Sequence, residues 1–350
     1  MNNDLSSYFE DPEFKEALEK YEGMVKNHTP AYFDADELTD IAEYYASKGR
    51  QIEAEAAIDF ALQLHPIDTD ALIFRARSLA MKGRLDEAYM VMDLIEDRSD
   101  REVRFLKADL LMEEKRMEEA DHVFEELAAY EEGKLETLID IILAYIDANQ
   151  EALAKKWIKH VGETYDLASL SQKNQKFRDL LCDFYITFNN PEAAIPLLQA
   201  TLDCYPYSIN HWNSLGKCYL STNDYEEAHE AIDFALAIDD SNAEALTLKA
   251  FCYQQSGELQ KSCDYYLRLA EQQENKTRAY LALAKTYFEM QDYTSSIYYI
   301  EALLDNKDAL SKYELSELYG DIALCHAALK HIGVGQASIR RSLELNENDP

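Results

Sequence analysis

The side chains best suited to acid–base or metal chemistry are spread thinly along this chain. Histidine is the residue most often used as a general acid, a base or a metal ligand near neutral pH. The eight histidines fall at widely separated positions: His28, His65, His122, His160, His211, His229, His326 and His331. The motifs G-x-G-x-x-G, G-x4-G-K-[ST], H-E-x-x-H and G-x-S-x-G do not occur. We therefore expect a protein that is not an enzyme.

The six cysteines do not have the spacing of a metal site, because the sequence contains no C-x2-C pair and no histidine cluster. Cys218, Cys252 and Cys325 recur at one position of a repeating pattern, which is typical of small packing residues on a helix. The sequence therefore predicts free thiols, no metal and no cofactor.

Charge limits the kinds of partner. The 350 residues include 34 Lys and Arg against 67 Asp and Glu, for a net charge of -33 at pH 7. Such a surface repels phosphate backbones and anionic lipids, so we expect neither nucleic acid nor membrane as a partner. The first residues lack a basic region followed by an apolar one, and no run of about 18 apolar residues occurs. We expect a cytoplasmic protein.

The elements that must position any site come from an internal repeat. Residues 209–242 carry Trp212, Leu215, Gly216 and Tyr219 at the spacing W-x2-L-G-x2-Y. In these residues the chain resembles the tetratricopeptide repeat (TPR) family. The resemblance implies an all-α fold, a right-handed α-α superhelix in which each repeat of 34 residues is one antiparallel helix pair.

The pattern predicts about nine such repeats, most of them separated by 34 residues. They begin at Ala35, Thr69, Arg101, Leu135, Gln175, Ile209, Ala243, Thr277 and Ser316. Repeats 1–4 occupy residues 35–174 and repeats 5–9 occupy residues 175–350. About six extra residues near Ser169 and five near Ser311 are expected to form loops or helix extensions.

The segment of residues 1–34 precedes the first repeat. Within it, Asp11 and Pro12 predict the start of a helix that runs to about Lys26 and caps the first repeat. Its apolar stripe consists of Phe14, Ala17, Leu18, Tyr21 and Val25. No second cap follows the last repeat, whose final helix is either a polar end or a contact with a second chain.

Three positions of the repeat test its register. Position 20, where two helices approach closely, is always small: Ala54, Ala88, Ala120, Ala154, Ala194, Ala228, Ser262, Ser296 and Gly335. Position 8 is also small in every repeat except the fourth, which has Ile142. Position 15 predicts a left-handed turn between the two helices at Gly49, Gly83, Asn149, Asn189, Asn223 and Gly257.

The family resemblance implies that positions 2, 5, 9, 12 and 13 face a concave groove. In repeats 1–3 these positions are mostly acidic: Asp36, Glu43, Asp70, Glu102, Asp109 and Glu113, with Arg77 and Phe105 among them. In repeats 6–8 they include cations, asparagines and aromatic residues, which suit a peptide with an acidic group. The candidate peptide-binding residues are Asn210, Asn213, Lys217, Phe251, Arg278, Leu281, Lys285 and Phe288.

Three functions remain open on the sequence alone. The first is a scaffold or adaptor that binds a protein or peptide partner of unknown identity in the groove. The second is a structural homo-oligomer, possible as a homodimer through the uncapped C-terminal repeat. The third is a regulator that senses a peptide by changing its superhelical pitch. Binding of chaperone tails is not supported, because only Arg278 matches the carboxylate clamp that the family uses for them.

Overall fold

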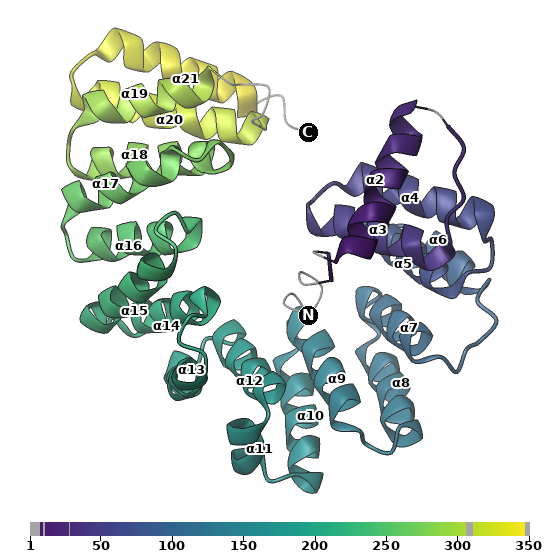
Figure 1. The fold of residues 1–350 in the computed structure, drawn as a ribbon. Coiled ribbons are helices and arrows are strands. Elements are labelled where there is room, and N and C mark those ends of the chain that lie inside the picture. The colour runs from purple at the N-terminus through teal and green to yellow at the C-terminus, as the bar shows by residue number, and fades with distance from the viewer. Residues whose placement is uncertain (1–7, 10, 28, 306–310, 347–350) are drawn as a thin grey trace. The chain divides into compact units, whose positions relative to one another are not determined.

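The computed structural model describes residues 8–9, 11–27, 29–305 and 311–346. These residues form α-helices joined by short turns, with one 3-10 turn and no strand (Figure 1). The chain divides into two compact units, unit 1 (Met1–Val161) and unit 2 (Gly162–Pro350). The predicted boundary after residue 174, which separates repeats 1–4 from repeats 5–9, stays a prediction. The predicted all-α, TPR-type solenoid fold is confirmed.

The described part of unit 1 contains the N-terminal helix α2 followed by helix pairs. They are α2 (Pro12–Asn27), α3 (Ala35–Ser47) with α4 (Gln51–Leu64), α5 (Thr69–Met81) with α6 (Leu85–Met92), α7 (Arg101–Glu113) with α8 (Met117–Tyr130), and α9 (Leu135–Asp147) with α10 (Glu151–Thr164), whose last turn crosses into unit 2. The second helix of repeat 2, α6, is short because this repeat has fewer residues than the others.

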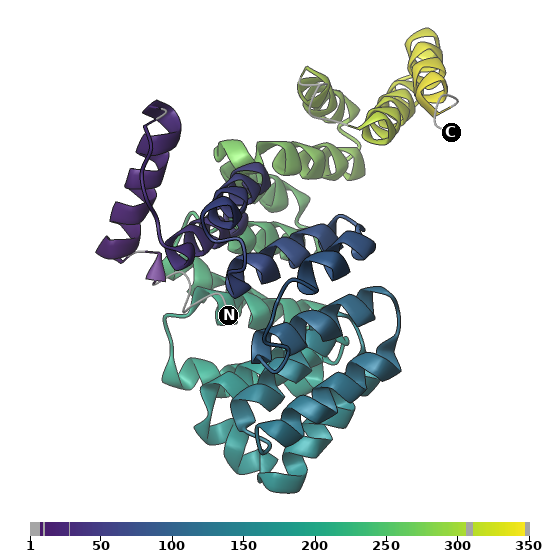
Figure 2. The same ribbon diagram turned by 90° about the vertical axis from the view of Figure 1, so that its right-hand side faces the viewer.

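Unit 2 begins with a short helix and continues in helix pairs. They are α11 (Leu167–Lys173), α12 (Gln175–Thr187) with α13 (Pro191–Cys204), α14 (Ile209–Thr222) with α15 (Tyr225–Ile238), α16 (Ala243–Gln255) with α17 (Leu259–Ala270), η1 (Gln273–Asn275), α18 (Lys276–Glu289) with α19 (Tyr293–Leu304), and α20 (Lys312–Ala328) with α21 (Ile332–Asn346). Figure 2 shows α20 and α21 (yellow) packed together as the last pair.

The predicted register agrees closely with the helix boundaries. From α3 to α16 the first helix of every repeat begins at the predicted residue, whereas α18 begins at Lys276 and α20 at Lys312. Every small residue predicted at position 20 is buried. At position 8, a Cβ on Gly216 would lie 2.8 Å from Cγ1 of Ile232, which shows how closely α14 approaches α15.

The left-handed turn between the two helices is present at all six predicted glycines and asparagines, with φ between 54 and 79°. The same conformation occurs at position 15 of the other repeats, at Lys115, Gln291 and Lys330, although these side chains do not favour it. The backbone geometry of the repeat therefore overrides local residue preference at these three turns.

The N-terminal helix α2 packs against α3, as expected for a cap. Phe14 and Tyr21 are buried in the same apolar cluster as Tyr45 of α3. Val25, the last residue of the predicted apolar stripe, is 52% exposed near the end of the helix and does not join this cluster. At the other end of the chain, α21 leaves four apolar side chains exposed: Ile332, Val334, Ile339 and Leu343.

The extra residues before repeat 5 form the separate helix α11. Arg178 of α12, which is 4% exposed, holds this helix in place. Its guanidinium donates to the carbonyl oxygens of Ser171 and Gln172 at 3.1 and 3.2 Å, and to Oγ1 of Thr201 in α13 at 2.7 Å. One buried cation therefore connects three helices.

Candidate binding surfaces on the first helices

The first helices of successive repeats pack against one another within each unit, for example α3 with α5, α5 with α7, and α14 with α16. We call the surface formed by positions 2, 5, 9, 12 and 13 of these helices the first-helix face. Polar contacts between neighbouring repeats join some of these positions, such as Arg77 with Glu102 and Lys217 with Glu244.

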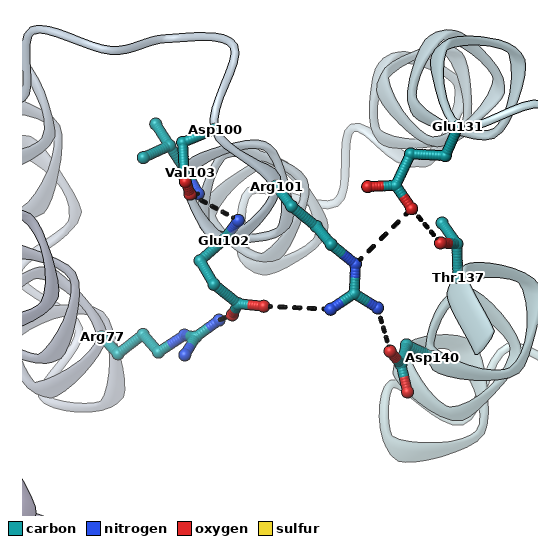
Figure 3. Close-up of polar contacts among 8 residues, drawn as sticks. All are labelled: Arg77, Asp100, Arg101, Glu102, Val103, Glu131, Thr137 and Asp140. Carbon is teal, nitrogen blue, oxygen red and sulfur yellow. Dashed lines mark hydrogen bonds and ion pairs between the residues drawn. The ribbon is translucent and has the colours of Figure 1, made fainter. Parts of the chain in front are cut away.

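In unit 1 the first-helix face is an acidic surface crossed by one arginine. Arg77 at position 9 of α5 lies 3.5 Å from a carboxylate oxygen of Glu102 and 3.5 Å from one of Asp109, both on α7. Figure 3 shows Glu102 between Arg77 and Arg101. Arg101 also pairs with Asp140 of α9 and lies 3.9 Å from Glu131. These contacts tie α5, α7 and α9 into one network.

Three carboxylates of this surface, Glu43, Asp70 and Asp109, have raised pKa values. Burial raises the pKa of Asp109 to about 6, an effect that Arg77 opposes and Glu102 reinforces. Burial also raises the pKa of Glu43 and of Asp70, and neighbouring carboxylates add to both shifts. The acidic side chains therefore repel one another, and Arg77 relieves part of this repulsion.

Phe105, an expected groove residue, is not available on this surface. It is 7% exposed and packs against the ring of Phe124 of α8, with 5.2 Å between the ring centroids. The expectation fails because position 5 lies at the edge of the face, where a large apolar side chain turns into the core.

In unit 2 two of the predicted peptide-binding residues contact the neighbouring repeat. Asn213 is 1% exposed, and its Nδ2 donates to Oδ1 of Asn242 at 3.1 Å and to a carboxylate oxygen of Glu244 at 3.0 Å. Lys217 forms an ion pair with the same carboxylate. Glu244 therefore occupies the groups that the sequence assigned to a ligand, whereas Asn210 on the first turn of α14 remains exposed.

The next repeats carry cations and aromatic rings that are open to solvent. Arg278 and Lys285 of α18 are exposed and form no ion pair with any residue that the structure describes. Phe251 of α16 is 42% exposed and Phe288 of α18 is 39% exposed. Leu281 is half-buried against the apolar cluster of α19 and α20.

Two interactions connect this surface to the neighbouring helices, one a hydrogen-bonded contact and the other electrostatic. The side-chain amide of Gln254 in α16 donates to both carboxylate oxygens of Glu289 in α18, at 2.9 and 2.8 Å. On the other side, Lys285 lowers the pKa of Asp321 in α20, although burial raises it more strongly. The helices α16 and α18 are thus joined by a neutral donor, and Arg278 and Lys285 of α18 take no part in this contact.

The structure also reveals a Ser–His–Asp chain that the sequence did not indicate. Oγ of Ser208 lies 2.6 Å from Nδ1 of His211, and Nε2 of His211 lies 3.3 Å from Oδ1 of Asp179. In serine hydrolases Nε2 faces the serine and Nδ1 faces the aspartate, which is the opposite orientation. Here His211 contacts Ser208 just before α14, and its other ring nitrogen faces Oδ1 of Asp179 in α12, which has no hydrogen-bond partner among the described residues.

Within residues 8–9, 11–27, 29–305 and 311–346, no three His, Cys, Asp or Glu side chains are grouped so that they could hold a metal ion. No helix in that part of the chain combines the length and apolar character needed to cross a membrane.

Comparisons with known proteins agree with this fold. The family model described as tetratricopeptide repeat matches residues 39–89 and 213–277. Over 191 residues the chain is 26% identical to the formate-dependent nitrite reductase complex subunit NrfG of Escherichia coli O157:H7, covering 53% of this chain and 89% of that protein.

Two solved structures are also similar. One is the C-terminal part of a TPR repeat-containing protein from Cytophaga hutchinsonii, with 18% identity and a TM-score of 0.53 over 70% of this chain and 96% of that one. The other is a tetratricopeptide repeat protein from Parabacteroides merdae, with 16% identity and a TM-score of 0.46 over 72% and 98%. With the helix pairs and their register, the matches to the repeat model show that this chain is built from tetratricopeptide repeats.

Proposed function

We propose that this chain is a non-catalytic scaffold that binds a partner polypeptide on the first-helix face of α16 and α18. The observation that carries the proposal is the group formed by Arg278, Lys285, Phe251 and Phe288, where cations without an ion pair among the described residues accompany exposed aromatic rings. NrfG is by name a subunit of an enzyme complex, which supports a role beside other proteins.

The chemistry of this surface indicates the kind of segment that it binds. Arginine and lysine pair with carboxylates, and the planar guanidinium can hold one with two hydrogen bonds. The exposed rings of Phe251 and Phe288 offer apolar area to the side chains beside that carboxylate. The expected ligand is an extended or helical segment with an acidic residue or a terminal carboxylate beside apolar side chains.

A peptide-display selection tests this proposal. The full chain is used to select from a random library of peptides, and the same selection is made with Arg278→Glu/Lys285→Glu. We expect the wild-type chain to enrich sequences with acidic and apolar residues. We expect the double variant to bind them at least ~10-fold more weakly, because each lost cation also becomes a repelling charge.

The matched control is Lys312→Glu/Arg340→Glu, which changes the net charge equally at exposed positions of α20 and α21. It should leave binding within about 2-fold of wild type, since exposed charges outside an interface contribute little. Equal loss of binding in both double variants would mean that only net charge matters, and the proposed surface would be rejected.

A second candidate function is self-association through the last helix. The exposed Ile332, Ile339 and Leu343 of α21 support it, because they lie on one side of the helix and an uncovered apolar face favours association. Light scattering combined with size-exclusion chromatography distinguishes the candidates. A dimer that Leu343→Glu converts to monomers would support self-association, whereas a wild-type monomer at micromolar concentration would exclude it.

A further inference from the structure

Unit 2 contains a cavity of about 480 Å³ between α13, α14 and α15, on the side of α14 away from the first-helix face. We call it the aromatic–acidic cavity because its walls combine three rings with three carboxylates. Its aromatic and acidic lining residues are Trp212, Tyr219, Phe234, Asp203, Glu227 and Glu230. No lysine, arginine or histidine of the described chain lines it.

The lining follows from helix geometry. Glu227, Glu230 and Phe234 are spaced three and four residues apart, so they share one stripe of α15. Trp212 and Tyr219 are seven residues apart and share one stripe of α14. These are positions 4 and 11 of the repeat, which a period of 3.6 residues puts on the opposite side of the helix from positions 2, 9 and 13. The cavity is therefore separate from the proposed peptide surface.

The aromatic wall of the cavity is fixed in place. Trp212 stacks on Phe234 with 4.5 Å between the ring centroids and 19° between the ring planes. Nε1 of Trp212 donates to the carbonyl oxygen of Pro206 at 2.8 Å, which holds the indole in this orientation. Phe234 nevertheless remains 54% exposed, so ring area beyond the contact with Trp212 is open to a ligand.

The carboxylates of the cavity have no partner among the described residues. Asp203, Glu227 and Glu230 are exposed, and none forms an ion pair there. Elsewhere in unit 2, cations of the chain itself lie over tyrosine rings. The distances to the ring centroids are 5.1 Å for Lys261 over Tyr253, 5.4 Å for Arg268 over Tyr265 and 5.5 Å for Lys276 over Tyr280. Among the described residues no such cation covers the rings of the cavity, which therefore combines open ring area and negative charge.

We propose that the aromatic–acidic cavity binds an arginine side chain of a partner polypeptide. A guanidinium stacks flat on an aromatic face and directs its N–H groups outward in its own plane, parallel to the ring, where the carboxylates of Glu227, Glu230 and Asp203 can accept them. A quaternary ammonium has no N–H to donate, and an ammonium cannot stack. This site goes beyond the proposed function and uses the opposite side of the repeat.

Fluorescence of Trp212 reports on the cavity directly. The chain has only two tryptophans. The other, Trp157, belongs to unit 1, and the full-length Trp157→Phe variant leaves Trp212 as the sole reporter. The probes are arginine blocked at both ends, blocked lysine, blocked citrulline, free arginine and tetramethylammonium. We expect blocked arginine to change the emission saturably, with a Kd on the order of 1 mM, which is typical for a ligand of this size.

The other probes decide which chemistry is recognised. Blocked citrulline, which has the same shape without the charge, should bind at least ~10-fold more weakly, because hydrogen bonds from charged donors are the stronger ones. Blocked lysine should also bind more weakly than blocked arginine. Tighter binding of tetramethylammonium, or binding of free but not blocked arginine, would overturn the proposal in favour of a small-molecule site.

Variants of the cavity complete the test in the Trp157→Phe background. Glu227→Gln/Glu230→Gln keeps the shape and removes two charges, and Phe234→Leu removes the exposed ring. Each variant should lower the affinity for blocked arginine about 10-fold. Glu226→Gln is the matched control, because Glu226 is exposed on the same helix and does not line the cavity. Unchanged affinity in both cavity variants, or no binding of blocked arginine to the parent chain at ~10 mM, would refute the site.

Discussion

At the scale of single residues, the turn between the two helices of a repeat offers a direct test of backbone strain. Lys115 and Gln291 adopt φ of 62° in this turn, the conformation that Gly49 and Gly83 adopt at the same position. A side chain with a Cβ costs about 1–2 kcal/mol in this region, and glycine does not. The two residues are therefore sites of local strain.

Lys115→Gly and Gln291→Gly should each stabilise the fold by about 0.5–1 kcal/mol, because relief of strain exceeds the extra flexibility that glycine gives the unfolded chain. Urea denaturation followed by circular dichroism measures the effect. Ala148→Gly is the control, since Ala148 has φ of -75° one residue before a left-handed turn, and it should lose stability. A loss in all three variants would contradict the strain argument.

Gly216 tests how closely the two helices of a repeat approach each other. A Cβ at this position would lie 2.8 Å from Cγ1 of the buried Ile232, so Gly216→Ala should destabilise unit 2 by about 1–3 kcal/mol. Gly23→Ala in α2 is the matched variant, because a Cβ there would meet no packing neighbour within 4 Å, and it should gain about 0.5–1 kcal/mol. Thermal unfolding of both variants checks the opposite signs.

Arg77 controls ionisation on the acidic surface of unit 1. Burial raises the pKa of Asp109 to about 6, and Arg77 lowers it. The carboxyl of Asp109 therefore holds its proton more tightly in the folded chain than in the unfolded chain. Because of this, the free energy of unfolding falls as the pH rises from about 4 to about 6. Arg77→Met should raise the pKa of Asp109 further and so cost more stability at pH 7 than at pH 5, by less than about 1 kcal/mol because the site is partly exposed.

Carbon-13 NMR of the Asp109 carboxyl measures this pKa, and urea midpoints at the two pH values measure its effect on stability. Arg84→Met is the control, because the ion pair of Arg84 is with the exposed Glu87 of α6 and its loss should be the same at both pH values. A pKa of Asp109 that does not rise in Arg77→Met would contradict the account.

Much of the packing and turn geometry of the repeats could be predicted from residue patterns in the sequence. Small side chains at position 20 and glycine or asparagine at position 15 indicated buried contacts and turns, because each has a local physical requirement. The strained turns at Lys115 and Gln291 could be placed only by register. The pairing of Lys217 with Glu244 was missed, since it depends on how position 9 of one repeat meets position 2 of the next.

At the scale of elements, α11 shows where periodicity fails. A helix of seven residues has too few turns for an apolar stripe to appear, so the sequence indicated only extra residues between repeats. What holds α11 is Arg178, whose guanidinium satisfies the carbonyl oxygens of Ser171 and Gln172 at its C-terminal end. The partner lies in the next helix, which a local pattern does not reveal.

Arg178→Met should therefore release α11, because these carbonyls lose their donor while the buried apolar part of the side chain is kept. Hydrogen–deuterium exchange should become at least ~10-fold faster across Leu167–Lys173, and α21 should not change. Arg340→Met, an exposed arginine of α21, is the control and should leave α11 protected. Unchanged exchange in Arg178→Met would show that other contacts fix the helix.

At the scale of the whole molecule, one repeat architecture carries surfaces of different character. The first-helix face of unit 1 is acidic, with Arg77 engaged by carboxylates, whereas that of unit 2 offers Arg278 and Lys285. The two faces differ in the residues at a few repeat positions, because both units are built from helix pairs of one architecture. Sequence patterns therefore predict the scaffold well, while the choice of partner depends on contacts between repeats.

The central claim is that a partner segment binds on α16 and α18. The most direct measurement is hydrogen–deuterium exchange of the full chain, with and without a peptide obtained by the display selection. The account predicts that the peptide slows exchange in Ala243–Gln255 and Lys276–Glu289, and that Arg278→Glu/Lys285→Glu abolishes this protection. Protection confined to α21 or to the helices of unit 1, retained in the double variant, would contradict it.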